Sequence, residues 1–193
     1  VKPGKSLANR LISYFIVGNC KKACMTANGV AYVTKDFLQS ICPCKAVVAG
    51  KDTDEYFTGN YSSVTLAEEF YGSPKRFEGQ KKYVITHTAN LIQNEAKGHG
   101  VVIRTIAELR KKGYDVSVVF IGDGCAVPEF KALAETLGVA DSVRFAGKIA
   151  NPMLIKEELI KSDFYLFPSE AEGLPRSVIE AMACGLVVVA SNV

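Results

Sequence analysis

The feature that most constrains the fold is a regular alternation of short apolar runs and amphipathic stretches in the second half of the chain. Five runs are expected to be strands: residues 83–86, 116–121, 143–146, 164–167 and 186–190. Several are continuously apolar, which is typical of strands buried on both faces of a parallel sheet. Helical patterns lie between them, near 102–112, 127–137, 154–159 and 175–185. The alternation predicts an α/β fold with a right-handed, doubly wound parallel sheet.

The first half of the chain is less regular. Residues 6–24 have helical spacing, and we favour a helix packed on a core over one bound to a membrane surface. Strands are expected at 30–33 and 46–49. Polar residues, glycine and proline interrupt the following segment. We therefore divide the chain into a first part at 1–50, a linker at 51–80 and a main domain at 81–193.

Composition narrows the functional classes. The chain has 193 residues, 48% of them hydrophobic, and a net charge of +3 from 23 basic and 20 acidic side chains. This charge is too small to indicate nucleic acid as a partner. The apolar stretch at 11–18 is much shorter than the roughly 20 residues that a membrane span needs, and no signal-peptide pattern opens the chain. Because it starts at Val1 and stops at Val193, we expect it to be truncated at both ends.

The cysteines leave two interpretations open. They are Cys20, Cys24, Cys42, Cys44, Cys125 and Cys184. The first four could form a four-thiolate metal site, but the single residue between Cys42 and Cys44 fits zinc spacing poorly. We favour reduced thiols, and we expect no metal.

Ligands of open parallel sheets bind where the carboxyl ends of strands lead into the next helices. The loop at 88–100 contains Lys97 and Gly98 just before a helix. A lysine at a helix N-terminus is unfavourable unless an anion is shared there. This position predicts a phosphate site, with a solvated surface lysine as the alternative.

The next loop carries the turn Gly122-Asp123-Gly124. A dinucleotide fingerprint requires a third glycine at position 127, where the chain has valine, so a dehydrogenase is disfavoured. The turn still lets the backbone approach a ligand closely.

The segment at 168–185 is the most informative. With Pro175 as the first helical residue, Glu172 and Glu180 should be about 10 Å or more apart. That is wider than the roughly 5–9.5 Å of a glycosidase pair. It suits an extended ligand with hydroxyls at both ends and an anion at the helix N-terminus, as in a nucleotide sugar. In the alternative interpretation, Glu180 is an exposed glutamate on a helix face, and Glu172 is a carboxylate that only interacts favourably with the helix dipole.

The run from Glu172 to Gly185, EGLPRSVIEAMACG, resembles the glutamate–seven–glutamate motif of retaining glycosyltransferases of the GT-B fold, group 1 (family 4). The resemblance covers residues 83–193 and includes Lys97-Gly98, the turn at 121–124 and the strand end at 145–147. Residues 5 to about 50 resemble the end of the family's N-terminal domain.

The resemblance implies that 81–193 is the incomplete Rossmann-like half that binds the nucleotide-sugar donor, and that 1–50 is a remnant of the acceptor domain. It implies catalytic roles for Lys97, on the donor phosphate, and for Glu172, on the transferred sugar beside the Gly173 and Leu174 amides. Glu180 would bind the ribose. Further donor-binding positions are Pro175, Gly122, Asp123 and Asn90.

The implied reaction transfers a sugar with retention to a glycan or lipid-linked acceptor in polysaccharide or glycolipid biosynthesis. No metal cofactor is implied. A cytoplasmic location is implied, including peripheral association with the inner face of the membrane. Asn90 stands where the family usually has an arginine, so either another cation compensates or the leaving group is less stabilised. We expect this chain alone to be inactive.

Two other functions remain open. One is a sugar-nucleotide epimerase or phosphorylase of the same architecture. The other is a non-catalytic interaction domain that has kept the scaffold.

Overall fold

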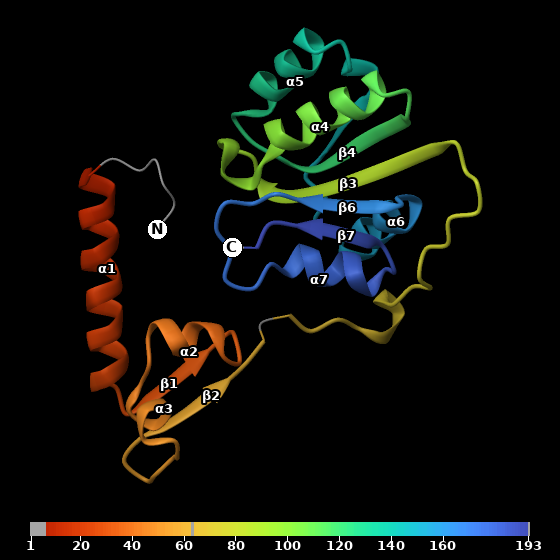
Figure 1. Cartoon of the computed structure of the whole chain (residues 1–193). Coiled ribbons are helices and arrows are strands. Elements are labelled where there is room, and N and C mark those ends of the chain that lie inside the picture. Colours follow the sequence, from red (N-terminus) through yellow and green to blue (C-terminus); the bar gives the residue numbers. More distant parts are fainter. Residues whose placement is uncertain (1–6, 63, 193) are drawn as a thin grey trace. The chain divides into compact units, whose positions relative to one another are not determined.

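The computed structural model describes residues 7–62 and 64–192. The chain divides into two compact units, with the boundary between Thr65 and Leu66 (Figure 1). This boundary falls inside the segment 51–80 that the sequence assigns to a linker.

The second unit is built on five parallel strands. These are β3 (Lys82–Leu91), β4 (Asp115–Asp123), β5 (Val143–Gly147), β6 (Phe164–Phe167) and β7 (Val187–Ala190). Their order in the sheet is β5-β4-β3-β6-β7. The chain therefore proceeds outward from β3 in one direction and then returns to fill the other side. The change of direction lies between β3 and β6, and it is there that open α/β sheets bind ligands.

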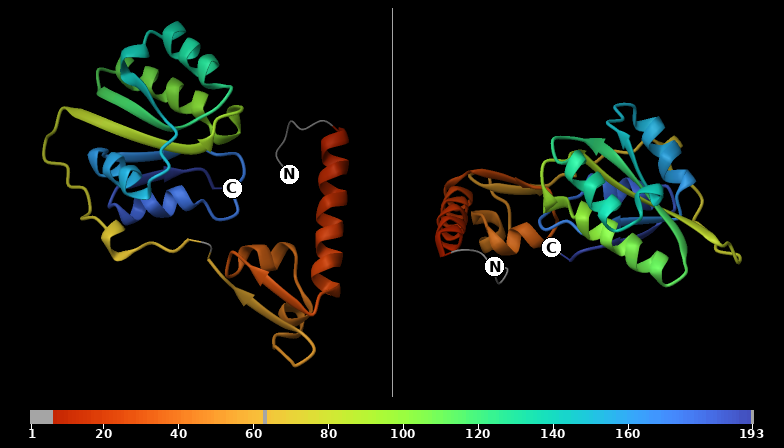
Figure 2. Two further views of the ribbon diagram at one scale, coloured as in Figure 1. Left: turned by 180° about the vertical axis from the view of Figure 1, so that it is seen from behind. Right: turned by 90° about the horizontal axis from the view of Figure 1, so that it is seen from above.

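Four helices connect these strands (Figure 2): α4 (His99–Lys111), α5 (Val127–Thr136), α6 (Pro152–Lys161) and α7 (Arg176–Ala183). Three 3₁₀ turns accompany them: η1 (Glu68–Phe70), η2 (Glu95–Lys97) and η3 (Ala140–Ser142). The doubly wound parallel sheet predicted from the sequence is confirmed, with each helix near its expected position.

The two faces of the sheet have separate cores. Phe164 and Leu166 of β6 pack on the core formed by β3, β4, α4 and α5, in which Phe120 is fully buried. Tyr165 and Phe167 belong to the other core, with residues of α6 and α7. Alternate residues of a strand point to opposite faces, so β6 contributes to both layers.

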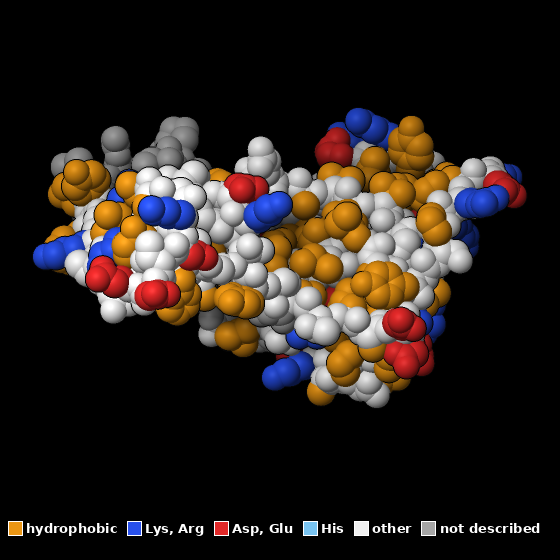
Figure 3. Space-filling model, turned by 90° about the horizontal axis from the view of Figure 1, so that it is seen from below, with side chains coloured by type: hydrophobic (Ala, Val, Ile, Leu, Met, Phe, Trp, Pro, Cys, Tyr) orange, Lys and Arg blue, Asp and Glu red, His pale blue; other side chains and the backbone are white. Residues whose placement is uncertain are grey.

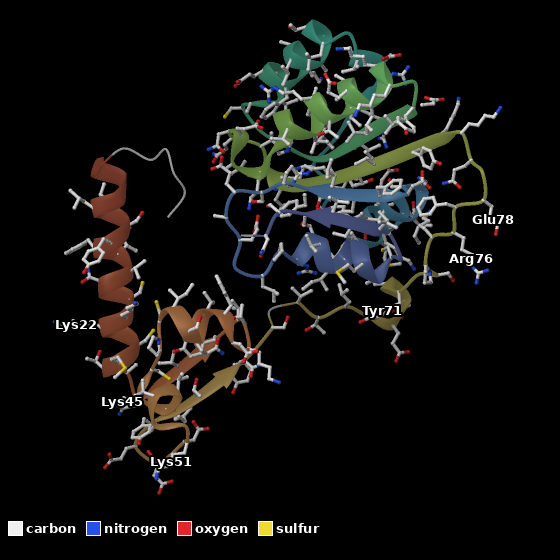
Figure 4. All side chains as sticks on the ribbon, in the orientation of Figure 1. Lys22, Lys45, Lys51, Tyr71, Arg76 and Glu78 are labelled. Atoms are coloured by element: carbon white, nitrogen blue, oxygen red, sulfur yellow. The ribbon has the colours of Figure 1, made fainter. Side chains whose placement is uncertain are left out.

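Residues 66–80 belong to the second unit. Phe70 is buried in its core, and the backbone N–H groups of Gly72 and Lys75 donate to the carbonyls of Ala183 and Gly185 at 2.8 and 2.9 Å. Arg76 and Glu78, just before β3, point away from the sheet (Figure 4).

The first unit contains α1 (Leu7–Thr26), β1 (Gly29–Tyr32), α2 (Phe37–Ile41), α3 (Lys45–Ala49) and β2 (Phe57–Asn60). The strand predicted at 46–49 is wrong: these residues form α3, which ends at Gly50 in the left-handed conformation. A short apolar run does not distinguish a strand from a buried helical turn. The parallel partner of β1 is instead β2, which lies within the expected linker.

Helix α1 confirms the helix expected at 6–24, of which Ser6 lies outside the described residues. The expected packing on a core is found only near Cys24. Leu11, Phe15 and Ile16 are more than half exposed, because the first unit's own core is small. Exposed apolar side chains are scattered among charged ones on the visible face (Figure 3). Within the described residues, no helix has both the length and the apolar character of a membrane span.

Candidate functional site

A cavity of about 700 Å³ opens at the carboxyl ends of the strands, where β3 and β6 lead in opposite directions. It is lined by seven of the positions that the sequence singles out: Asn90, Lys97, Gly122, Glu172, Leu174, Pro175 and Glu180. The other two, Gly173 and Asp123, do not line it. The fold therefore brings three segments of the chain together: the end of β3 with the following turn, the end of β4, and the β6–α7 loop with α7.

Lys97 and Glu172 form an ion pair across the cavity, with Nζ and Oε1 2.5 Å apart. The same Glu172 oxygen accepts a hydrogen bond from the Ser169 hydroxyl at 2.7 Å. The loops that carry the pair are joined, because the Glu170 N–H donates to the Ala96 carbonyl at 2.9 Å. Glu172 is thus held by the cation opposite it as well as by its own loop.

The start of α4 is capped by the chain itself. The Glu95 carboxylate accepts hydrogen bonds from the N–H groups of Gly100 and Val101 at 2.9 and 3.0 Å. Glu95 therefore supplies the anion that the sequence argument assigned to a bound phosphate at this helix. The support for a phosphate near Lys97 comes instead from the cavity that Lys97 lines.

Two glycines allow the loops to approach so closely. Gly98 has a φ of +78°, and a Cβ there would lie 2.5 Å from the Pro168 carbonyl oxygen. Gly122 has a φ of +137°, and its Cβ would lie 1.7 Å from the Ala89 carbonyl oxygen. Backbone from β3, β4 and β6 therefore converges at the cavity, which any side chain at these positions would prevent.

Glu180 lies on α7 and is only 8% exposed, so it is not the solvent-facing glutamate of the alternative interpretation. Its Oε1 accepts a hydrogen bond from Arg176 Nε at 2.8 Å, one helical turn away. Helix α7 begins at Arg176, one residue later than the sequence predicts, and Pro175 caps it without a side-chain hydrogen bond. The start of α7 thus presents backbone N–H groups beside a buried carboxylate.

Beneath the cavity, Tyr165 joins the two halves of the sheet. Its hydroxyl lies 2.7 Å from the Thr88 Oγ1. Burial raises the pKa of Tyr165 to about 12, so the hydroxyl remains protonated at neutral pH.

Two histidines lie behind Lys97, and the sequence analysis missed both. His87 and His99 are fully buried, with ring centroids 4.5 Å apart. His87 Nδ1 is 2.8 Å from the Leu166 carbonyl oxygen, while the other three ring nitrogens have no hydrogen-bond partner among the described residues. Burial lowers the pKa of His87 to about 3 and that of His99 to about 4, so both rings are neutral. The available signal was positional: His87 lies in the expected first strand of the sheet, and His99 follows the Lys97-Gly98 pair at the start of the next helix.

Comparison with known proteins decides the family. A family model described as "Glycosyl transferases group 1" matches residues 82–193, more than half of the chain. The chain belongs to the group 1 glycosyl transferases. CapJ from Staphylococcus aureus is 32% identical over 172 residues, covering 89% of this chain and 40% of CapJ. The capsular polysaccharide biosynthesis glycosyltransferase CapH, also from S. aureus, is 30% identical over 92 residues, covering 46% of this chain and 25% of CapH.

The fold agrees with this family. The crystal structure of Anabaena Alr3699/HepE in complex with UDP and glucose matches with a TM-score of 0.66 and 20% identity, covering 94% of this chain and 50% of that one. The expected Rossmann-like architecture of a GT-B glycosyltransferase is confirmed. The chain spans at most 40% of the length of CapJ and CapH.

The cavity of this group 1 glycosyl transferase chain is also lined by two cations, Lys148 and Arg176, which the sequence analysis did not include among the site residues. Lys148 lies between β5 and α6. Arg176 lies inside the quoted motif, and the signal for it was its position four residues before Glu180.

The described residues that line this cavity include no cysteine. In the first unit, Cys24 and Cys44 pack around Tyr32. The Tyr32 hydroxyl donates a hydrogen bond to the Cys42 carbonyl at 2.7 Å. The six thiols form no disulfide. Over residues 7–62 and 64–192, no group of three or more histidine, cysteine or acidic side chains is arranged to hold a metal ion.

Proposed function

We propose that the protein to which this chain belongs transfers a sugar, with retention, from a nucleoside-diphosphate sugar to a hydroxyl of a glycan or lipid-linked acceptor. The observation that supports this most is the cavity at the change of strand direction, which holds two carboxylates, each paired with a cation. A nucleotide sugar has the matching order of groups: sugar hydroxyls, diphosphate, ribose hydroxyls.

In this proposal the two carboxylates bind the two ends of the donor. Glu172 accepts hydrogen bonds from the transferred sugar, beside the backbone amides of Gly173 and Leu174. Glu180 accepts hydrogen bonds from the ribose. Two hydroxyls can share one carboxylate, which accepts several hydrogen bonds, and bonds to a charged acceptor are about twice as strong as neutral ones.

The diphosphate between them is placed beside Lys97 and the start of α7. Around it lie Asn90 at the end of β3, Gly122 and Asp123 at the end of β4, and Pro175 just before α7. A helix N-terminus has free N–H groups and a partial positive charge, so it stabilises an anion. As the bond from the sugar to the phosphate breaks, negative charge grows on the departing diphosphate, and these donors stabilise it. The acceptor hydroxyl attacks from the same face. We propose that this charge stabilisation takes place without a metal ion.

The setting follows from the family and its relatives. The name of CapH connects it to capsular polysaccharide, and we propose polysaccharide or glycolipid biosynthesis as the process. We place the reaction in the cytoplasm, with lipid-linked acceptors reached at the inner face of the membrane.

Calorimetric titration of the chain with UDP and uridine tests the donor assignment; UDP is the probe because the HepE structure contains it. Lys97→Gln should weaken UDP binding by roughly tenfold or more and leave uridine unchanged, since a hydrogen bond to a charged group contributes about 1.5–3 kcal/mol. Arg76→Gln, an exposed cation that points away from the sheet, is the matched control. Equal losses for UDP and uridine in the Lys97 variant would exclude its phosphate contact.

Two further measurements separate the alternatives. A thermal shift with nucleotide sugars should stabilise the chain, whereas no response to any nucleotide would favour an interaction domain. The full-length protein should give a product whose anomeric configuration, read by NMR coupling constants, equals that of the donor. An inverted product would contradict the proposed retention, and interconversion of the donor without transfer would favour an epimerase.

A further inference from the structure

Arg176 is a cation of the cavity to which the proposed function gives no role. It is the first residue of α7, it lines the cavity, and its side chain is 55% exposed. A guanidinium has five N–H donors in a rigid plane. Among residues 7–62 and 64–192, the recorded hydrogen bond of this guanidinium is the 2.8 Å bond from Nε–H to Glu180, and the Nη donors are available to a ligand.

The charges that line the cavity show why a second cation is needed. Among the described residues they are Lys97, Lys148 and Arg176 against Glu172 and Glu180. Lys97 already neutralises Glu172, and Asn90 brings no charge. A nucleoside diphosphate carries at least two negative charges, which Lys97 alone does not balance. Of the other two lining cations, Lys148 and Arg176, it is Arg176 that lies beside a carboxylate proposed for the donor.

The position of Arg176 indicates which phosphate it meets. Its partner Glu180 is the carboxylate proposed for the ribose, and the phosphate bonded to the ribose is the α-phosphate. Lys97 is paired with Glu172, the carboxylate proposed for the transferred sugar, which is bonded to the β-phosphate. The two ion pairs therefore correspond to the two halves of the diphosphate.

We propose that Arg176 is the α-phosphate ligand of the donor site and that Glu180 orients it. Glu180 Oε1 keeps the Nε–H, Glu180 Oε2 accepts from the ribose, and the Nη donors bind the phosphate from the side. The planar fork of arginine suits two parallel hydrogen bonds to phosphate oxygens. In this arrangement the first-turn N–H groups of α7, to which the N-cap Pro175 gives no side-chain hydrogen bond, donate to the same phosphate. This inference rests on the proposed function and assigns the two phosphates to different cations.

Three ligands that differ by one phosphate at a time test it: uridine, UMP and UDP, titrated calorimetrically into the 193-residue chain. The guanosine and adenosine series follow in the same format. Arg176→Gln should lower the affinity ratio of UMP to uridine about tenfold or more. Arg176→Lys should retain part of that ratio, since it keeps the charge and loses the second hydrogen bond. Lys97→Gln should leave this ratio unchanged and lower the ratio of UDP to UMP.

Two controls separate a lost phosphate contact from a general loss of charge or of folding. Arg76→Gln removes an exposed cation of the same unit and should leave both ratios at their wild-type values. Arg176→Gln also leaves the buried Glu180 without its cationic partner, so thermal denaturation must show that this variant folds. If it does not fold, Arg176→Lys replaces it in the test, because the lysine keeps a cation beside Glu180.

The possible outcomes are distinct. If wild-type chain binds UMP and UDP but Arg176→Gln leaves the UMP-to-uridine ratio unchanged, the role of Arg176 is refuted while the proposed function stands. If Arg176→Gln lowers the ratio of UDP to UMP instead, the phosphate assignment is reversed and therefore wrong. If wild-type chain binds none of the nucleotides in the three series, the proposed function fails, and this inference fails with it.

Discussion

Acidification from pH 7 to pH 5 should destabilise the second unit by about 4 kcal/mol through His87 and His99. Both rings are fully buried, and burial lowers their pKa values to about 3 and about 4. In the unfolded chain a histidine has a pKa of about 6.5. The unfolded state therefore binds two protons as the pH falls through this value, and the folded state binds neither until the pH nears 4.

The magnitude follows from proton linkage. The stabilisation is fully present above pH 6.5 and is lost as the pH falls toward the folded-state values. At pH 5, which is 1.5 units below 6.5, each histidine costs about 2 kcal/mol at 1.36 kcal/mol per unit. Burial is the main cause of the low pKa of His87, and the positive charges of His99 and Lys97 lower it further, whereas burial alone lowers the pKa of His99.

Urea denaturation, followed by circular dichroism between pH 7 and pH 5, measures this loss of unfolding free energy. Hydrogen exchange of the β3 and β4 amides shows whether the loss occurs in the second unit. The chain contains only these two histidines, so no other imidazole titrates in the window. His99→Phe should halve the dependence of the unfolding free energy on pH. The site accepts an aromatic ring, since that of His99 stacks on Phe130 and contacts Phe120 at a tilt. His87→Asn, which can still donate to the Leu166 carbonyl, should remove the other half. Equal stability at pH 7 and pH 5 would refute the assignment of buried neutral rings.

Three other substitutions follow from the same structure. Gly98→Ala should lower the free energy of unfolding by about 1–3 kcal/mol, and by more than Gly113→Ala, because both glycines have positive φ but only Gly98 would place its Cβ on a neighbouring carbonyl. Equal costs in chemical denaturation would contradict the close approach. Phe120→Ala should cost about 3–5 kcal/mol, since the ring is fully buried between α4, α5 and the sheet; a melting temperature within a degree of wild type would show that the core is loose. Glu180→Gln should weaken uridine binding roughly tenfold by calorimetry, and an unchanged affinity would argue against its contact with the ribose.

The sheet could be predicted from the sequence because its signals are local. Continuous apolar runs such as 116–121 and 164–167 are separated by helices with regular spacing and glycine ends, and all five appear in the structure as strands. The run at 46–49 has the same apolar character, yet it forms α3, because four residues carry no periodicity that separates the two states. Strand β3 continues to Leu91 because its pairing with β4 continues, so Asn90 lies at a strand end rather than in a loop.

That seven of the nine candidate residues line one cavity could also be predicted, since strand ends of a parallel sheet meet at one edge. Their partners could not. The bond between Lys97 and Glu172 joins residues 75 positions apart and depends on two loops that meet only in the fold. The burial of Glu180 and of the two histidines depends likewise on packing between layers. Glu95 shows the reverse case, in which a side chain close in sequence provides the anion that the helix start requires.

The decisive measurement is a crystal structure of the full-length protein with a bound nucleoside-diphosphate sugar. We expect the diphosphate at the start of α7, within hydrogen-bonding distance of Lys97 Nζ, with Glu172 on the sugar and Glu180 on the ribose. A donor bound elsewhere while this cavity stays empty, or a donor here whose ribose and sugar both lie away from the two carboxylates, would contradict it.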